Sequence, residues 1–149
     1  MPDPRNTVAF DEVATRRVTY KIDNVTIIYD KTKTKGSAQV GFAVGLSDDG
    51  IVELVNDNNV IEGKLDEVFP DNKASVIVDG YAFLPAGAAA AVAIGRKVIG
   101  ALGPAGARGF VKAVPAASAP PTQAEVNAAL NGRGAIVAND DTTKLVIRL

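Results

Sequence analysis

Short turn-forming segments rich in Asp, Asn and Gly recur along this chain, between stretches rich in β-branched residues. Asp and Asn side chains bond their own backbone, and Gly adopts a positive φ freely, so such segments favour a sharp change of chain direction. The clearest ones span residues 47–50, 56–59, 70–73 and 139–142. Short strands at this spacing are typical of a barrel or sandwich rather than of strand–helix–strand units. The sequence therefore predicts a mainly β chain.

Two hairpins are predicted in the first half of the chain. In the first, Val18, Tyr20 and Ile22 alternate with polar residues, Asp23-Asn24 makes a tight turn, and residues 25–29 return as a second strand. In the second, residues 38–46 and 51–55 flank the turn at 47–50.

The clearest alternation lies at the C-terminal end of the chain. There Leu145, Ile147 and Leu149 share one face with Thr143, while Lys144, Val146 and Arg148 share the other. A period of two is that of a strand with one buried face. We expect a terminal strand that faces the core.

One short helix is predicted near residue 125. Thr122 and Glu125 have the spacing of a capping box, and Asn131-Gly132 provides a stop. Val126, Ala129 and Leu130 recur on one face of this helix. The Pro- and Ala-rich stretch before it, residues 114–121, cannot join a central sheet because proline lacks an N–H donor. It is expected to be an exposed excursion.

The length of 149 residues fits one domain, which at this size buries roughly two-thirds of its unfolded surface. Residues 1–16 carry two prolines, mixed charges and no sustained period, and are expected to form an extended N-terminal arm. Residues 17–149 then form a single β domain. Its predicted architecture is a small antiparallel β-barrel or β-sandwich, jelly-roll or tulip-like, with one short helix.

Charge and hydropathy argue against several partners. Sixteen basic and seventeen acidic residues give a net charge of −1, which disfavours a nucleic-acid binder. The longest apolar stretch, residues 86–94, is about half of the ~20 residues that cross a bilayer, so no membrane contact is expected. The polar N-terminus has no apolar run behind it and predicts synthesis without a signal peptide, in a cytoplasm.

The chain contains no His and no Cys. These absences remove the commonest general base and the usual zinc ligands. None of the four serines lies in a Gly-x-Ser-x-Gly elbow, and the Gly-rich segments 87–97 and 103–109 miss the spacing of phosphate-binding loops. We therefore expect no enzyme activity and no cofactor.

Three acidic pairs, Asp48-Asp49, Asp66-Glu67 and Asp140-Asp141, are the remaining candidates for a cation site. None has the ligand spacing of an EF-hand loop, and two of them lie in predicted turns, where Asp is favoured for its own backbone bonds. No metal is expected. The basic run at residues 31–36 is expected to be a solvated loop or strand edge.

Several segments together resemble the capsid decoration, or cement, proteins of tailed bacteriophages. The resemblance covers residues 35 to 149. Its marks are GSAQVG at residues 36–41, GYAFLPAG at 80–87, GRKV at 95–98, and the stretch from Arg133-Gly134 to the C-terminal strand. These are glycine and turn positions rather than catalytic ones.

The resemblance implies a structural virion protein with a β-barrel or sandwich fold. Proteins of that class are commonly trimeric, sit on the outer capsid surface and clamp neighbouring major capsid subunits. The implied partners are therefore the major capsid protein and two further copies of this chain. The implied location is the virion, with synthesis in the host cytoplasm.

The N-terminal arm is the predicted capsid contact, because a disordered segment can wrap a large surface and order on binding. Arg5, Phe10, Arg16 and Arg17 are its predicted anchors, since interfaces concentrate binding energy in Arg and aromatic residues. Three alternatives remain open: the base domain of a head fibre, a ligand-binding β-barrel module and a carboxylate-based enzyme. The ligand-binding module would use Tyr20, Tyr29 and Tyr81, or the Asp pairs.

Overall fold

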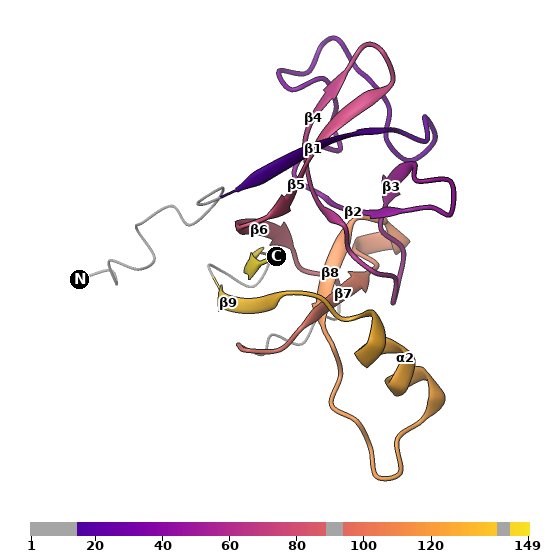
Figure 1. The fold of residues 1–149 in the computed structure, drawn as a ribbon, viewed down its shortest axis with the longest axis vertical. Coiled ribbons are helices and arrows are strands. Elements are labelled where there is room, and N and C mark those ends of the chain that lie inside the picture. Colours follow the sequence, from indigo (N-terminus) through magenta and orange to yellow (C-terminus); the bar gives the residue numbers. More distant parts are fainter. Residues whose placement is uncertain (1–14, 89–93, 140–143) are drawn as a thin grey trace, which may run out of the picture.

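Antiparallel strands make up most of the regular secondary structure in the computed structural model, which describes residues 15–88, 94–139 and 144–149 (Figure 1). In these residues ten strands form three sheets, accompanied by one α-helix and one 3-10 turn. The predicted mainly β class with one helix is confirmed. The sheets do not close into a barrel.

The largest sheet has five strands in the order β1-β5-β4-β2-β3. Their bounds are β1 Arg16–Lys21, β2 Ala43–Leu46, β3 Val52–Leu54, β4 Gly63–Phe69 and β5 Lys73–Asp79. The predicted hairpin around residues 47–50 is confirmed, with shorter strands: β2 pairs with β3, Gly50 has a φ of 71° and the Ser47 amide donates to the Ile51 carbonyl. The turn at 70–73 joins β4 to β5, with Asn72 at a φ of 61°.

The predicted hairpin of residues 17–29 is wrong. β1 pairs with β5, and residues 25–29 form a bent loop instead of a strand. The physical reason is Asp23, whose carboxylate accepts hydrogen bonds from the Thr26 amide, the Thr26 hydroxyl and the Ile27 amide. Burial raises the pKa of Asp23, but these bonds outweigh it and lower the pKa overall. The loop buries Ile27 and leaves Val25 76% exposed.

This same loop covers the outer edge of β3. Ile22 forms a parallel bridge with Val52, the Asp23 amide donates to the Val52 carbonyl, and the Leu54 amide donates to the Thr26 hydroxyl. The chain that leaves one edge strand, β1, therefore meets the strand at the opposite edge of the sheet. The sheet is strongly curled as a result.

The remaining strands form two smaller sheets. A three-stranded sheet has the order β6-β10-β9, and a two-stranded sheet pairs β7 with β8. Their bounds are β6 Tyr81–Pro85, β7 Val98–Ala101, β8 Phe110–Ala113, β9 Ala135–Asn139 and β10 Lys144–Arg148. A loop containing the 3-10 turn Pro104–Gly106 joins β7 to β8, in agreement with its Gly- and Pro-rich sequence.

The C-terminal strand β10 is the central strand of its sheet. Leu145 and Ile147 are fully buried, which confirms the predicted core-facing strand. Val146 was expected on the opposite face, with Lys144 and Arg148, and it is buried as well, so β10 buries apolar side chains on both faces.

Two apolar clusters form the core. One packs beneath the five-stranded sheet around Ile22, Val44 and Leu65, and the other joins the two smaller sheets around Val98, Leu145 and neighbouring side chains. The neighbours Ala43 and Val44 of β2 belong to different clusters, so this strand contributes to both.

The helix α2 spans Gln123–Asn131. Its predicted capping box is confirmed: the Glu125 amide donates to the Thr122 hydroxyl, and the Thr122 amide donates to the Glu125 carboxylate. The helix ends at the predicted stop, yet its predicted apolar face is not its packing face, because Ala128 is buried while Leu130 is 77% exposed. Residues 115–121 are exposed as predicted, and project with α2 away from the sheets (Figure 1).

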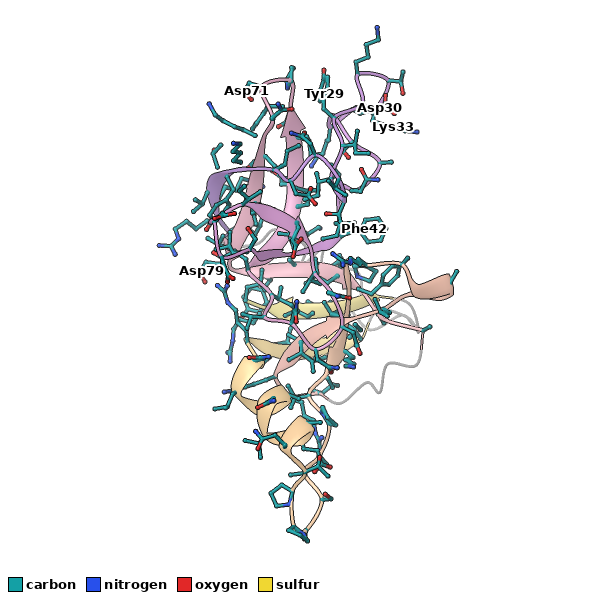
Figure 2. All side chains as sticks on the ribbon, turned by 90° about the vertical axis from the view of Figure 1, so that its right-hand side faces the viewer. Tyr29, Asp30, Lys33, Phe42, Asp71 and Asp79 are labelled. Atoms are coloured by element: carbon teal, nitrogen blue, oxygen red, sulfur yellow. The ribbon has the colours of Figure 1, made fainter. Side chains whose placement is uncertain are left out.

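The loop with the basic run lies at the other end of the molecule, where Figure 2 shows Tyr29, Asp30 and Lys33 opposite the end that carries α2. Most of residues 31–36 are exposed, in agreement with the predicted solvated loop. Across residues 15–88, 94–139 and 144–149, no helix is long and apolar enough to cross a membrane.

Glu125 connects the helix to the Pro/Ala loop, and we expect this connection to depend on pH. The Thr122 amide and the Ser118 hydroxyl and amide donate to its carboxylate, which lowers its pKa to about 2. A lowered pKa means that the stabilisation is present above the ordinary value of 4.5 and is lost as the pH falls through about 2. We expect the Ser118 and Thr122 amide NMR signals to titrate with a midpoint near 2. In Glu125→Gln this titration should vanish, and a wild-type midpoint near 4.5 would contradict the assignment.

Candidate interaction site

The four predicted capsid contacts fall into two groups. Arg5 and Phe10 lie outside the described residues. Arg16, predicted as the last residue of the arm, is the first residue of β1, and Arg17 follows it in the same strand. Both arginines are exposed, and their role in capsid contact stays a prediction.

Arg17 of β1 is tied to Asp66 of β4, which lies two strands away in the same sheet. The Arg17 Nε lies 2.9 Å from Asp66 Oδ2, and the Lys35 Nζ lies 3.0 Å from Asp66 Oδ1. The Asp66 side chain is only 12% exposed. Burial raises its pKa, but the hydrogen bonds and charges of Lys35 and Arg17 outweigh burial and lower the pKa overall. Asp66 therefore serves the fold as a buried anion.

The acidic pairs do not assemble a metal centre in the part of the chain that the structure describes. No group of three or more potential ligands lies together there. Asp48 and Asp49 lie in the turn between β2 and β3, as the turn chemistry predicts, and Asp140 and Asp141 fall outside the described residues.

Replacing Asp66 with Asn is expected to lower the free energy of unfolding by about 1–2 kcal/mol at pH 7, because two charge-assisted hydrogen bonds to exposed cations are lost. Since the pKa of Asp66 is lowered in the folded state, wild-type stability should fall as the pH drops from about 4. The variant should lose less over that range. Urea unfolding at several pH values measures both effects.

The matched control for Asp66 is Asp71→Asn. Asp71 pairs with Lys73 at 3.0 Å, but both side chains are more than half exposed. Its loss should cost less than about 0.5 kcal/mol. Equal effects of the two substitutions would contradict the structural role of Asp66.

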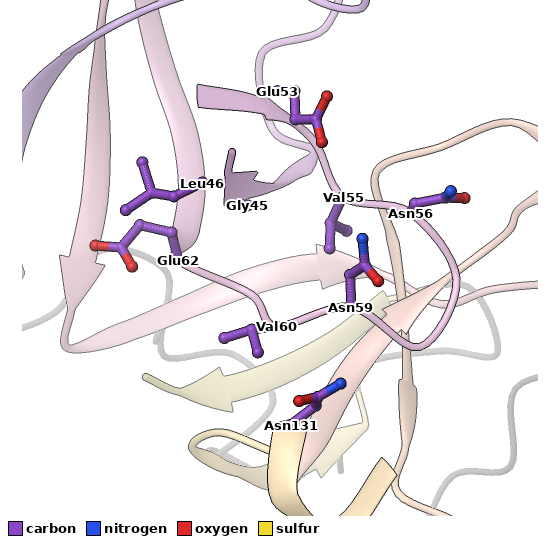
Figure 3. A pocket seen from close by; sticks show the side chains of 9 residues that line it. All are labelled: Gly45, Leu46, Glu53, Val55, Asn56, Asn59, Val60, Glu62 and Asn131. Carbon is purple, nitrogen blue, oxygen red and sulfur yellow. The ribbon is translucent and has the colours of Figure 1, made fainter. Parts of the chain in front are cut away.

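A cavity of about 370 Å³ opens on the surface of the described residues (Figure 3). It lies where the β2–β3 hairpin, the chain between β3 and β4, and the C-terminal end of α2 meet. Its principal side chains are Leu46, Glu53, Asn59, Val60, Glu62 and Asn131.

The turn at residues 56–59 lines this cavity with Asn56 and Asn59 and lies directly on β7. The Asn58 amide donates to the Gly100 carbonyl and the Gly100 amide donates to the Asn59 carbonyl, each at 2.9 Å. A Cβ on Gly100 would collide with the Asn56 carbonyl, so this close approach requires glycine. The Asn131 side chain also donates to the Asn58 carbonyl, at 3.0 Å. The turn is therefore held from two sides.

Arg133 fixes one wall of the cavity from behind. Its guanidinium donates to the carbonyls of Ile61, Glu62 and Val78 at 3.2, 2.7 and 2.7 Å, and lies 3.5 Å from the Glu62 carboxylate. The Tyr20 hydroxyl donates to the same carboxylate at 2.7 Å. Burial and the Glu62 charge raise the pKa of Tyr20, so this donor stays protonated. Glu62 is thereby held in place.

Other polar side chains of the cavity make fewer contacts with the rest of the protein. Glu53 lies 3.8 Å from Arg108, beyond hydrogen-bond distance, and neither its carboxylate nor the Asn59 side chain makes a hydrogen bond to any described residue. Leu46 and Val60, which are 43% and 49% exposed, provide apolar walls beside them. The arrangement offers hydrogen-bond acceptors next to apolar surface.

Sequence reasoning recognised the turn at 56–59 but not the cavity. The outward orientation of Glu53 could have been predicted, because Glu53 alternates with the buried Val52 and Leu54. The role of Arg133 could not be predicted from neighbouring residues, because the carbonyls that it binds are 55 to 72 residues away in the chain.

A second cavity, of about 300 Å³, is lined by Phe42, Phe83 and Lys64 among others. The Phe42 ring also packs against Phe110 with ring centroids 5.3 Å apart. These rings support each other and leave fewer uncommitted polar groups than the first cavity.

Comparisons with protein-family models, curated proteins and solved structures found no match to this chain.

Proposed function

We propose that this protein is a structural virion protein that binds the outer surface of an assembled phage capsid as a homotrimer and clamps neighbouring major capsid subunits. The sequence resemblance over residues 35–149 supports the class of protein. The observation that carries the proposal is a set of exposed apolar side chains on loops and at one strand end that the fold holds in place.

Two pairs of these side chains illustrate the observation. Val25 and Ile28 are exposed on a loop that Asp23 holds through three hydrogen bonds, and Leu46 and Val60 are exposed where they line the cavity of about 370 Å³. Single exposed apolar residues are common on any surface, but pairs on constrained segments favour contact with another protein. Such contact needs no catalytic group.

The proposal includes a barrel-like fold for the five-stranded sheet. The Ile22–Val52 bridge supports it, because it brings chain from both edges of the sheet together. A curled sheet of this kind presents its connecting loops at its ends, where they can reach a neighbouring subunit.

A protein of this type stabilises a shell by binding the assembled lattice and not the dissociated subunits, which shifts the equilibrium by mass action. Three linked copies strengthen the effect, since weak contacts that act together raise the apparent affinity by about 10²–10⁴.

The test is a mass measurement by size exclusion with light scattering, followed by cosedimentation with undecorated phage heads. We expect three times the chain mass of 15.4 kDa and sedimentation with heads, which then survive higher temperatures. A monomer that stays in the supernatant would contradict the proposal.

The arm is tested separately by deleting residues 1–14, which leaves β1 complete. We expect weaker sedimentation with heads and an unchanged melting temperature. Lys33→Ala, an exposed change at the opposite end of the molecule from α2, is the control. Undiminished binding by the deletion variant would remove the role of the arm.

A further inference from the structure

We propose that the cavity between the β2–β3 hairpin and α2 is a socket for one basic side chain, arginine in preference to lysine, presented by a partner protein. The identification of that partner as a capsid subunit rests on the proposed function. The chemistry of the socket stands on the side chains that line it.

Charge is the first argument. Both ionisable residues that line the cavity, Glu53 and Glu62, are acidic. Glu62 is engaged by Tyr20 and Arg133, whereas Glu53 has a cation only at 3.8 Å and makes no hydrogen bond within residues 15–88, 94–139 and 144–149. An incoming guanidinium can therefore bond Glu53 without displacing an existing hydrogen bond.

The amides are the second argument. The Asn59 side chain is uncommitted, and Asn131 uses its Nδ2 to bind the Asn58 carbonyl, which leaves its Oδ1 as an acceptor. Guanidinium carries five N–H donors in a rigid plane and suits several acceptors at once, while ammonium is a compact point charge. This difference favours arginine.

The apolar walls are the third argument. Leu46 and Val60 are each nearly half exposed and flank the polar groups. The methylene stem of an arginine packs on such surface while its head group reaches the acceptors. Because Gly100 and Asn131 already hold the turn at 56–59, little ordering remains to be done on binding.

Other ligands fit less well. An anion would meet two carboxylates. A sugar is usually held against an aromatic face, and none of the nine residues that line the cavity is aromatic.

The experiment titrates N-acetyl-arginine amide into the full ¹⁵N-labelled chain and follows the side-chain amide signals of Asn59 and Asn131. We expect saturable shifts with a Kd of about 1–10 mM, the range for one side chain without its protein. The control is N-acetyl-citrulline amide, which has nearly the same shape and no charge, and should bind at least about tenfold more weakly. Equal binding of the two probes would overturn the proposal.

Matched variants locate the effect. Glu53→Gln removes the carboxylate that makes no hydrogen bond to the described residues and should weaken arginine binding about fivefold or more. Asp49→Asn makes the same change of charge in the exposed turn outside the cavity and should leave it unchanged. Shifts that persist in Glu53→Gln would assign the binding to another surface. Melting temperatures equal to wild type establish that both variants are folded.

Cosedimentation with phage heads separates this inference from the proposed function. If heads bind wild type and Asp49→Asn but not Glu53→Gln, both proposals are supported. If heads bind all three alike, the socket does not contact the capsid and the function stands. If the chain binds capped arginine but no heads, the socket stands and the function fails.

Discussion

Deleting residues 146–149 is expected to abolish cooperative folding. The deletion removes two buried side chains, Val146 and Ile147, and most of the central strand of the β6-β10-β9 sheet. Full burial of an aliphatic side chain contributes about 1.5–3 kcal/mol, and β6 and β9 would also lose their shared hydrogen-bonding partner. The sum exceeds about 5 kcal/mol, which equals the whole stability of many small domains.

Thermal unfolding followed by circular dichroism measures this effect, and the expected trace has no sigmoidal transition. The control is Arg148→Ala, which keeps the strand but removes an exposed side chain of β10, and should shift the free energy of unfolding by less than about 0.5 kcal/mol. A truncated chain that melts like wild type would show that β10 is not part of the core.

Replacing Arg133 with Ala is expected to cost about 3–5 kcal/mol. One guanidinium satisfies three carbonyls from two distant segments, Ile61–Glu62 and Val78, and it also faces the Glu62 carboxylate. Each hydrogen bond to a charged donor contributes about 1.5–3 kcal/mol, reduced here because the side chain is partly exposed. Urea unfolding at pH 7 gives the value.

Two further variants test whether the loss in Arg133→Ala comes from the guanidinium contacts. Arg133→Lys keeps the charge but cannot reach three carbonyls in one plane, so it should recover only part of the loss. Arg108→Ala removes an exposed arginine whose nearest carboxylate, Glu53, lies 3.8 Å away, and should cost less than about 1 kcal/mol. Equal losses of unfolding free energy for Arg133→Ala and Arg108→Ala would show that the three carbonyl contacts of Arg133 do not stabilise the fold.

The features predicted correctly from the sequence depend on residues that are close in the chain. The capping box needs only Thr122 and Glu125, and the β2–β3 hairpin needs only the turn at 47–50. The buried face of β10 follows from alternation over five residues. In each case the interactions that stabilise the element lie within the same short segment.

The failed hairpin shows where this reasoning stops. Residues 25–29 have a strand-like composition, but Asp23 bonds Thr26 and Ile27 and bends the chain. β1 then pairs with β5, more than fifty residues further along. Alternation of apolar and polar residues predicts that a segment can be a strand. It does not select the partner strand, because burying an apolar face is favourable against any other apolar face.

The cavity could not be predicted from the sequence for the same reason. The turn at 56–59 was readable, whereas its contacts with Gly100 and Asn131 join segments more than forty residues apart. Arg133 is an ordinary arginine in sequence and supports a cavity wall only because the segment before β4, strand β5 and the chain after α2 meet around it.

The sequence by itself determined the mainly β class, the positions of the turns, the helix with its cap and the exposed Pro/Ala excursion, since each depends on local backbone preferences and hydrogen bonds. Tertiary structure alone decided which strands pair, that Asp66 is a buried anion rather than a cation ligand, and that Glu53, Asn59 and Asn131 surround one cavity. These outcomes depend on how distant segments pack, and packing energy is shared among all the surfaces that the chain can bury.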